Sequence, residues 1–295
     1  MDQPTFDGLN TYAVARAAAE SGLKVALSGL GADELFDGYG YGRRVVALER
    51  ARRLPGLARR VAAPAAGLLP GRKGEKARCW LEGQLPTGAA HELLRRLFLP
   101  REVERLLASS GRPVPPAQPS PQPADVPLSH AGEGPPGEVQ TLLDLAGYTR
   151  DVLLRDTDCM SMAHGLEVRV PYLDHVLVEF VLRLPTEVRA APGKGLLAET
   201  ARDLLPPVVP ARHKRGFVLP FDRWLRGPLR HEVAATFSAP PHAVAMLLDQ
   251  TEMMRLWRRF FGGGTSWHGV WALYALCRWV ASLAEVEGMV LESGR

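Results

Sequence analysis

The chain has 295 residues, of which 46% are hydrophobic and 23% charged, and its formal net charge is +4. This balance excludes wholesale disorder and a fibrous chain, and the length suits one large domain or two ordinary ones. Three widely separated cysteines exclude a disulfide framework and a cysteine-based zinc ribbon. No signal peptide is readable at the N-terminus, so we expect a cytoplasmic protein. The modest net charge requires neither a nucleic-acid nor a membrane partner, and we expect neither.

The N-terminal segment predicts a helix followed by one strand. Residues 9–20 have a helical pattern, and residues 24–28 predict a short, buried strand. A turn at Gly29 and Gly31 follows, and a new helix is expected directly after it. A strand, a glycine turn and a helix make half of a nucleotide-binding α/β unit. No second convincing strand follows before the C-terminus.

Helical patterns dominate the rest of the chain. They cover residues 43–60, 91–99, 101–108, 139–151, 176–183, 196–204, 230–237, 252–261 and 267–286. Nine of the 25 prolines fall between residues 109 and 137, where we expect a flexible insertion because proline breaks helices and strands. Residues 270–284 are the most hydrophobic stretch, but Arg278 interrupts it. It is too short to cross a bilayer of about 30 Å and predicts a buried helix.

Positive charge is concentrated in one segment. Residues 43–78 contain eleven basic and two acidic residues, a net charge of +9, so the remainder of the chain is net −5. Such a segment can be a surface for phosphate, RNA or anionic lipid. The alternative is a solvated helical face in a chain with 31 Arg and only 5 Lys. The lack of aromatic residues within the cluster favours this alternative.

Residues 27–39 contain the sharpest motif, a glycine turn followed by two acidic residues. The glycines allow the backbone to turn tightly and approach a ligand, and the amides at a helix N-terminus favour phosphate. Asp33 and Glu34 beside those amides are suited to holding Mg²⁺ on a polyphosphate. The alternative is that Ser28 and Asp33 only cap a helix after an ordinary strand.

Two later stretches also carry clustered charges. Residues 155–175 interleave ionisable and apolar side chains, so their charges must pair with each other or with a ligand. The alternative is a structural ion pair, such as Glu167 with Arg169, inside a helical core. Residues 211–220 place four basic side chains, Lys214 among them, before a glycine. This arrangement suits a pyrophosphate, although such a stretch alone is more often a solvated loop.

In this order, the three stretches resemble the synthetase domain of asparagine synthetase and its amide-forming relatives, including the β-lactam synthetases. Further matching segments are residues 2–4, Gly193-Lys194, Lys214-x-Gly216-Phe217, Trp224-Leu225, residues 227–229 and the Trp-rich last helix. The resemblance implies a mainly α fold, the helical C-terminal part of an α/β adenine-nucleotide α-hydrolase-like synthetase domain with one or few parallel strands. Within this partial domain, 1–295, residues 1–42 would form a strand–loop–helix unit, 109–137 the insertion and 138–295 the helical part.

The resemblance also implies ATP-dependent adenylation of a carboxylate, followed by attack of an amine that releases AMP. The cofactor-binding positions that it assigns are Ser28, Gly29, Gly31, Asp33 and Arg169. Asp33 would also hold Mg²⁺ and pyrophosphate. Glu167 and Lys214 match catalytic positions of the family, and Arg169 would brace Glu167.

The chain departs from the family pattern at three places. Position 2 is Asp, where the glutaminase domain has a cysteine after the initiator Met, so we expect no glutaminase domain here. The S-G-G-x-D-S loop that holds the ATP pyrophosphate should precede Asp2 and is absent. Leu30 replaces a glutamate assigned to proton handling, which a leucine cannot perform. This residue points to a divergent amide synthetase with another acceptor or amine.

Three hypotheses follow. The first is the C-terminal part of an asparagine-synthetase-type ligase that uses ATP, Mg²⁺ and an aspartate-like carboxylate, with the missing halves encoded upstream or supplied by a separate chain. The second is a non-catalytic remnant that binds a partner through the edge of a solitary strand. The third is an RNA-binding helical module built on residues 43–78, whose binding would depend steeply on salt. We favour the first.

Overall fold

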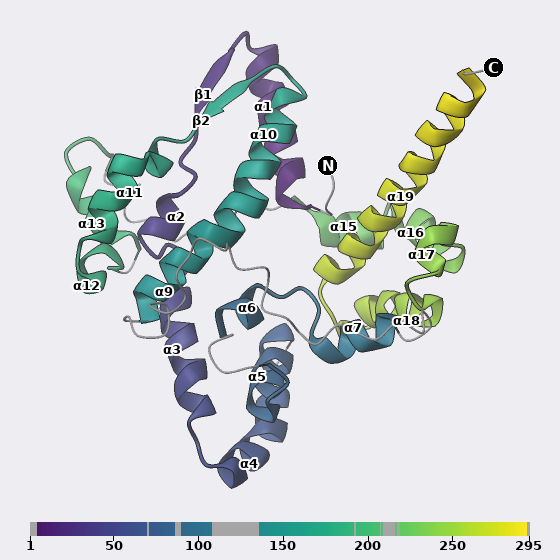
Figure 1. The fold of residues 1–295 in the computed structure, drawn as a ribbon, viewed down its shortest axis with the longest axis horizontal. Helices are drawn as coiled ribbons and strands as arrows, with labels where there is room; N and C mark the ends of the chain where they lie inside the picture. Colours follow the sequence, from purple (N-terminus) through teal and green to yellow (C-terminus); the bar gives the residue numbers. More distant parts are fainter. Residues whose placement is uncertain are drawn as a thin grey trace.

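The fold is mostly helical, as the sequence predicted, and the described part of the chain contains two short strands (Figure 1). The computed structural model describes residues 5–69, 71–85, 90–107, 136–191, 193–206, 208, 216 and 219–293. Its elements, in chain order, are α1 (Asp7–Glu20), β1 (Val25–Leu27), α2 (Ala32–Leu35), α3 (Tyr41–Arg52), α4 (Gly56–Gly67), α5 (Arg72–Glu82), α6 (Ala90–Arg95), α7 (Pro100–Leu107), α9 (Pro136–Leu143), the π-helix η2 (Asp144–Leu154), α10 (Arg155–Met162), β2 (Glu167–Arg169), the 3₁₀-helix η3 (Pro171–Leu173), α11 (His175–Leu182), α12 (Thr186–Arg189), α13 (Gly195–Thr200), α15 (Phe221–Arg226), α16 (Arg230–Ser238), α17 (His242–Ala245), α18 (Gln250–Phe261) and α19 (Trp267–Ser293).

The two strands form a parallel sheet, which corrects the prediction of a solitary strand. Val25 in β1 lies beside Glu167 in β2, and Leu27 lies beside Arg169. With three residues and one apolar side chain, β2 is too short to show the alternation by which strands are recognised. The prediction that β1 is buried was also wrong, because Val25 and Leu27 are 40% and 75% exposed.

One face of the sheet is open and the other is partly covered. Side chains alternate along a strand, so Val25, Leu27, Glu167 and Arg169 share one face, and all four are exposed. On the other face, the central residues of both strands are half-buried. Helices α1 and α10 pack against each other and lie beside the strands (Figure 1).

A hairpin of helices, α3, α4 and α5, extends from this region (Figure 1). The single helix predicted over residues 43–60 is in fact two, because Pro55 ends the first and precedes the second. Trp80 in α5 is fully buried, and its Nε1 donates a hydrogen bond to the Leu48 carbonyl of α3 at 2.7 Å. Arg52, the last residue of α3, donates to the Trp80 carbonyl at 2.6 Å, which joins α3 to α5.

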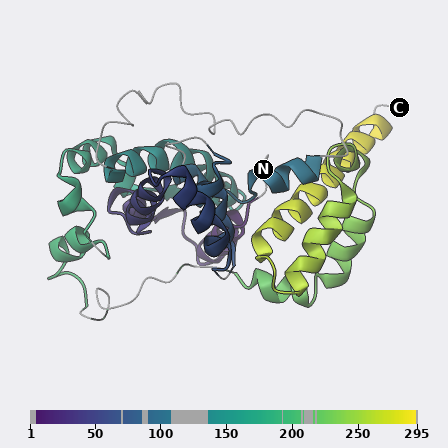
Figure 2. The same cartoon turned by 90° about the horizontal axis from the view of Figure 1, so that it is seen from below.

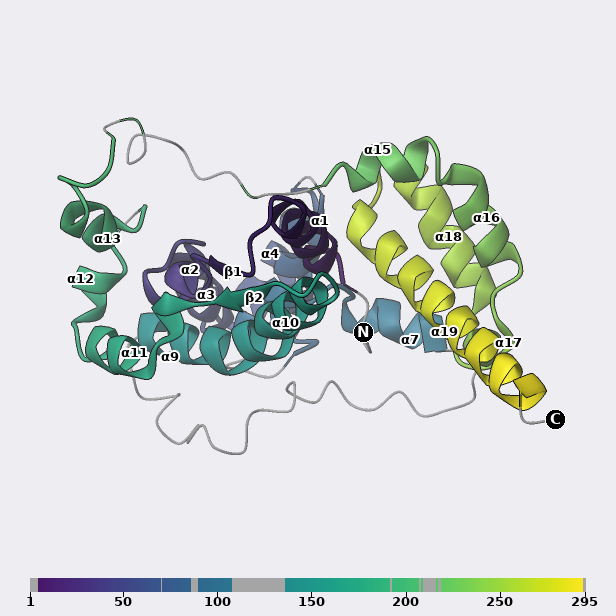
Figure 3. The same cartoon turned by 90° about the horizontal axis from the view of Figure 1, so that it is seen from above.

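The last five helices pack together beside the rest of the fold (Figures 2 and 3). Their core contains Leu225, Val233, Phe237, Val244, Met253, Trp257, Phe260, Val270, Leu273, Tyr274 and Cys277, with Leu106 of α7. The buried helix predicted over residues 270–284 is the first part of α19, although Leu283 is 45% exposed. Among the described residues, no helix is long and apolar enough to cross a membrane.

Most other predicted helices are confirmed. Those expected after residue 90 are present, although α6 and α13 end earlier and α19 runs further than predicted. Residues 2–4, nearly all of the Pro-rich insertion and residues 211–215 lie outside the described part of the chain. The division of the chain at residues 42 and 138 stays a prediction.

Candidate functional site

The loop after β1 turns tightly at the carboxyl end of the strand. The Ser28 amide donates to the Arg169 carbonyl at 2.8 Å, which continues the sheet by one residue. The Leu30 amide then donates to Ser28 Oγ at 3.3 Å. At Gly29, an added Cβ would meet no atom within 4 Å, so the space beside this residue is open. The tight glycine turn predicted from the sequence is therefore present.

Gly31 closes this loop against the helical part of the chain. Its φ of +96° lies in the left-handed region, and an added Cβ would lie 2.5 Å from Leu173 Cδ2. Only glycine fits both requirements. The helix that follows, α2, has only four residues. This helix is shorter than the helix that usually follows the glycine turn of a nucleotide-binding motif, so its dipole adds little to anion binding.

Asp33 projects from α2 toward a lysine distant in sequence. Its Oδ1 lies 3.0 Å from Nζ of Lys194, and the side chains are 26% and 29% exposed. Lys194 begins α13 with a φ of +59°, an uncommon backbone conformation for a residue with a side chain. A Cβ on Gly38 would lie 1.8 Å from Asp33 Oδ1 and 2.8 Å from Lys194 Cε. The ion pair therefore requires a glycine at position 38.

Glu34, next to Asp33, points into the interior. It is 3% exposed, and the Tyr39 hydroxyl donates to its Oε1 at 2.8 Å. Burial raises the pKa of Glu34, and the hydrogen bond from Tyr39 offsets this only in part. The expectation that Glu34 shares in holding Mg²⁺ does not agree with this position.

Glu167 and Arg169 lie on β2 beside the same loop. Arg169 Nε donates to Glu167 Oε1 at 2.7 Å, and both side chains are more than half exposed. This contact agrees with the prediction that Arg169 braces Glu167. The alternative of a pair inside a helical core is wrong, because the pair lies on the open face of the sheet.

A buried polar network adjoins Tyr39, and no sequence motif indicated it. Asp144 accepts hydrogen bonds from Arg95 at 2.6 Å, His91 at 2.9 Å and Gln140 at 2.8 Å. The Arg95 guanidinium also lies 5.0 Å from the ring centre of Tyr39, the residue that binds Glu34. The network therefore connects α6 and η2 to the candidate site.

A buried arginine holds α2 from another side. Arg189 in α12 is fully buried, and its guanidinium donates to the Leu35 carbonyl at 3.2 Å and to Thr141 Oγ1 at 2.6 Å. These bonds fix the end of α2 against α9. The position of Asp33 thus depends on residues more than 100 positions away in the sequence.

The family model for asparagine synthase matches residues 1–281, nearly the whole chain. The chain belongs to the asparagine synthase family. It is 29% identical over 240 residues to asparagine synthetase [glutamine-hydrolyzing] 1 of Bacillus subtilis, an alignment that covers 79% of this chain and 36% of that protein. It is 43% identical over 75 residues to the human asparagine synthetase [glutamine-hydrolyzing], covering 24% of this chain and 13% of the human protein.

This asparagine synthase family member spans about a third of the length of the curated relatives that it matches over most of its sequence. No solved structure matches the chain. Family membership supports the resemblance drawn from the motifs. The structure adds the open face of the sheet and the Asp33–Lys194 pair.

The structure brings together most, but not all, of the predicted site residues. Ser28 and Gly29 lie beside Arg169 and hence beside Glu167, and Asp33 lies in the first turn of the short helix that follows the loop. Lys214 lies outside the described residues, so its role stays a prediction. Sequence reasoning gave no role to Lys194, although Gly193-Lys194 was among the matching segments.

The donor set fits Mg²⁺ only in part. In the described part of the chain, no three His, Cys, Asp or Glu side chains come together as a metal site would require. Mg²⁺ commonly uses one or two carboxylates together with phosphate oxygens. Asp33, a partly exposed carboxylate beside a lysine, therefore fits Mg²⁺ carried by a polyphosphate and does not fit a metal held by protein alone.

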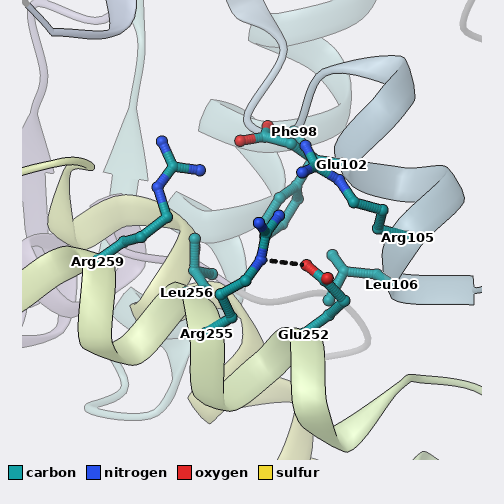
Figure 4. A pocket seen from close by; sticks show the side chains of 8 residues that line it. All are labelled: Phe98, Glu102, Arg105, Leu106, Glu252, Arg255, Leu256 and Arg259. Atoms are coloured by element: carbon teal, nitrogen blue, oxygen red, sulfur yellow. Dashed lines mark hydrogen bonds and ion pairs between the residues drawn. The ribbon is translucent and has the colours of Figure 1, made fainter.

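A separate pocket lies between α7 and α18 (Figure 4) and contains none of the predicted site residues. Its lining residues are Phe98, Glu102, Arg105, Leu106, Glu252, Arg255, Leu256 and Arg259. Arg255 pairs with Glu252 at 3.0 Å, and Arg259 pairs with Glu75 at 2.9 Å. These pairs neutralise much of its charge, so we assign no ligand to it.

Proposed function

We propose that this chain supplies the synthetase chemistry of an asparagine-synthetase-type ligase. The reaction would transfer the AMP moiety of ATP to an aspartate-like carboxylate, with release of pyrophosphate, and then form an amide, as in asparagine biosynthesis. One observation carries the proposal: the Ser28-Gly29 turn and the Glu167–Arg169 pair lie on adjacent strands of one parallel sheet. Ligands of such sheets bind beyond the carboxyl ends of the strands, where this turn lies.

In the first step, a carboxylate oxygen of the substrate would attack the α-phosphorus of ATP, and the bond to pyrophosphate would break. Ser28 and Gly29 would lie along the nucleotide, where the open space beside Gly29 admits a ligand. Mg²⁺, when bound, would neutralise phosphate charge. Asp33 would hold it from the protein side, and Lys214 would stabilise charge on the phosphates.

In the second step, an amine would attack the activated carbonyl carbon, and AMP would leave with the bridging oxygen. Glu167 would accept a proton from the amine, and the hydrogen bond from Arg169 would hold its carboxylate in position. Leu30 cannot take part in this transfer. A divergent amidotransferase that uses another carboxylate or amine is therefore the second candidate within the same chemistry.

We further propose that another polypeptide segment covers the open face of the sheet during catalysis. Leu23, Val25 and Leu27 are 51%, 40% and 75% exposed and adjoin the Glu167–Arg169 pair. Apolar side chains gathered on one face are typical of a surface that another polypeptide covers. The covering segment would carry the pyrophosphate-binding S-G-G-x-D-S loop, either in the same polypeptide or in a separate chain. Without catalysis, the same face would serve as a protein-binding module.

Exchange of labelled pyrophosphate into ATP tests the first step. The full chain, mixed with a polypeptide that carries the glutaminase and pyrophosphate-binding parts, should catalyse exchange that depends on a carboxylate substrate. A panel of carboxylates, aspartate among them, would identify the substrate.

Glu167→Gln should lower the later amide-forming step at least about 100-fold, within the range of a lost acid–base residue. The matched control is Glu179→Gln, which removes an exposed carboxylate that also pairs with an arginine. Exchange and amide formation should be unchanged in the control. If no carboxylate supports exchange in the mixture, the protein-binding module becomes the better description.

A further inference from the structure

The hairpin arm of α3, α4 and α5 carries an exposed apolar stripe. Leu57, Val61 and Leu68 are 76%, 69% and 86% exposed, and with Pro64 they recur every three or four residues. This spacing places all four on one side of α4. The opposite side packs on α5, where Ala63 is only 3% exposed. The stripe therefore contributes nothing to the core of the arm.

Arginines surround the stripe, and acidic residues are absent from its neighbourhood in the sequence. Between Arg50 and Lys73 there is no Asp or Glu. Arg53 and Arg60 are exposed, as is Arg50, and none of the three forms an ion pair within the described part of the chain. The arm thus presents apolar side chains and unneutralised positive charge together.

Other basic residues of the same segment have a different role. Arg52 donates to the Trp80 carbonyl at 2.6 Å. Arg72 pairs with Glu102 of α7 at 2.5 Å and with Glu75 at 2.8 Å. These two arginines hold the arm together and join it to α7. Arg53 and Arg60, which are exposed, make no such contacts with other described residues. The basic segment therefore contains arginines that hold the arm together and arginines that face solvent.

We propose that the α4 end of this arm binds the surface of an anionic lipid bilayer. Leu57, Val61 and Leu68 would enter the interfacial region, while Arg53 and Arg60 would contact lipid phosphates. A helix with an apolar side and basic flanks is the type that lies in a membrane interface. Arginine suits the boundary, because its apolar stem and charged head can occupy both environments. Such a contact lies on the bilayer without spanning it.

Two other partners fit the arm less well. RNA would use the arginines, but its phosphates and sugars have no use for a row of exposed leucines. A second copy of the chain, paired through the same surface, would bring the arginines of both arms together without acidic partners. An anionic bilayer uses both features. This proposal departs from the expectation of a solvated helical face and of no membrane partner.

The arm also lies away from the candidate site. Helix α4 lies at the bottom of Figure 1, at the end of the hairpin, and β1 and β2 lie at the top. Attachment through α4 would leave the open face of the sheet accessible to substrate and to another polypeptide. The lipid contact therefore does not depend on the proposed synthetase activity.

Co-sedimentation of the full chain with lipid vesicles tests this proposal. The chain should sediment with phosphatidylcholine vesicles that contain phosphatidylglycerol, and not with phosphatidylcholine alone. Binding should weaken as salt screens the arginines. The double variant Leu57→Ser/Leu68→Ser should bind at least about tenfold more weakly, because two apolar side chains no longer enter the interface. Arg53→Gln and Arg60→Gln should each weaken binding about fivefold.

Matched variants separate this surface from general effects of charge and hydrophobicity. Leu204→Ser removes a leucine that is 84% exposed outside the arm, and Arg183→Gln removes an exposed arginine of α11. Both should bind vesicles like the unmodified chain, and all variants should keep the same far-ultraviolet circular dichroism.

Three results would overturn the proposal. The first is no sedimentation with anionic vesicles, and the second is equal binding by the leucine double variant. The third is RNA binding, without vesicle binding, that is weakened by the arginine variants and unchanged in the leucine double variant. Concentration-dependent dimers that lose their contact in the leucine variant, again without vesicle binding, would assign the stripe to a second copy instead.

Discussion

The C-terminal helices and the sheet region differ in how completely they are enclosed. Around α15 to α19, Leu225, Phe237 and Phe260 are fully buried in one aromatic-rich core. In the sheet region, Leu27 is 75% exposed and the strands have one open face. Both regions belong to one chain of ordinary composition, so composition does not explain the difference. One region completes its own core, and the other offers an apolar face for something else to cover.

This difference shows where stability and function are placed. The closed region can be held by apolar packing alone. In the open region, a small apolar cluster around Leu35 is joined by buried polar contacts of Arg189, which hold the end of α2, and of Asp144. The candidate catalytic pair lies on the open face, where a ligand and a covering segment can reach it. Substitutions of matched residues in the two regions should expose this division.

The largest effect is expected from a leucine of the closed core. Leu225→Ala should lower the free energy of unfolding by about 2–5 kcal/mol, because the helices around a fully buried site relax only partly into the cavity. Leu27→Ala, the same change on the open face, should alter it by less than about 0.5 kcal/mol. Urea denaturation of the two variants measures both. Equal losses would mean that the sheet face is already covered in the isolated chain.

The next effect concerns the polar support of the open region. Asp144→Asn should lower the free energy of unfolding by about 3 kcal/mol at neutral pH, because it removes the buried carboxylate that pairs with Arg95 and His91. Asp151→Asn, which removes an exposed carboxylate paired with Arg150, should have an effect below about 1 kcal/mol. A loss of similar size in both variants would remove the distinction between the buried network and surface ion pairs.

The effect of Asp144→Asn should also depend on pH. Burial alone would raise the pKa of Asp144, but the hydrogen bond from His91 and the charge of Arg95 outweigh burial and lower it. The ion pair therefore stabilises the fold above the unfolded-state pKa and is lost as pH falls through the folded-state pKa. Urea denaturation at a series of decreasing pH values should show that the difference in free energy of unfolding between the unmodified chain and the Asp144→Asn variant becomes smaller. A difference that is constant with pH would contradict this account.

Two glycines of the candidate site should differ in how well they tolerate replacement by alanine. Gly38→Ala should lower the free energy of unfolding by about 1–3 kcal/mol, because its Cβ would overlap Asp33 Oδ1 and separate Asp33 from Lys194. Gly29→Ala should change it by less than about 0.5 kcal/mol, because nothing lies within 4 Å of the new Cβ. Thermal denaturation measures both changes. Tolerance of Gly38→Ala would show that the Asp33–Lys194 pair can form in another arrangement.

The sequence predicted the local elements of both regions better than their contacts. Helical periodicity identified α1, α16, α18 and α19, because each repeats its apolar residues over several turns. The same method missed β2, whose three residues are too few for a period of two to appear. It also joined α3 to α4 across Pro55, because the apolar and basic pattern continues on both sides of the break.

The candidate site was predicted in part. Motif order identified Ser28, Glu167 and Arg169, which the structure brings together. It could not identify the Asp33–Lys194 pair, since these residues are 161 positions apart and meet only through the folding of the intervening helices. Local patterns likewise gave Glu34 the same role as Asp33, although α2 turns one side chain outward and the other into the core.

A small effect on stability, together with a clear loss of activity, is expected at Arg169 on the open face. Arg169→Gln removes an ion pair between two exposed side chains, so the free energy of unfolding should change by less than about 1 kcal/mol. Amide formation should nevertheless fall at least about tenfold, because Glu167 loses the charge that orients it. Arg169→Lys should recover part of the activity, and Arg183→Gln, which breaks an exposed pair on α11, should leave it unchanged. Loss of stability and activity together would instead make Arg169 a structural residue of the sheet, and the open face would then resemble the closed core more than its exposure indicates.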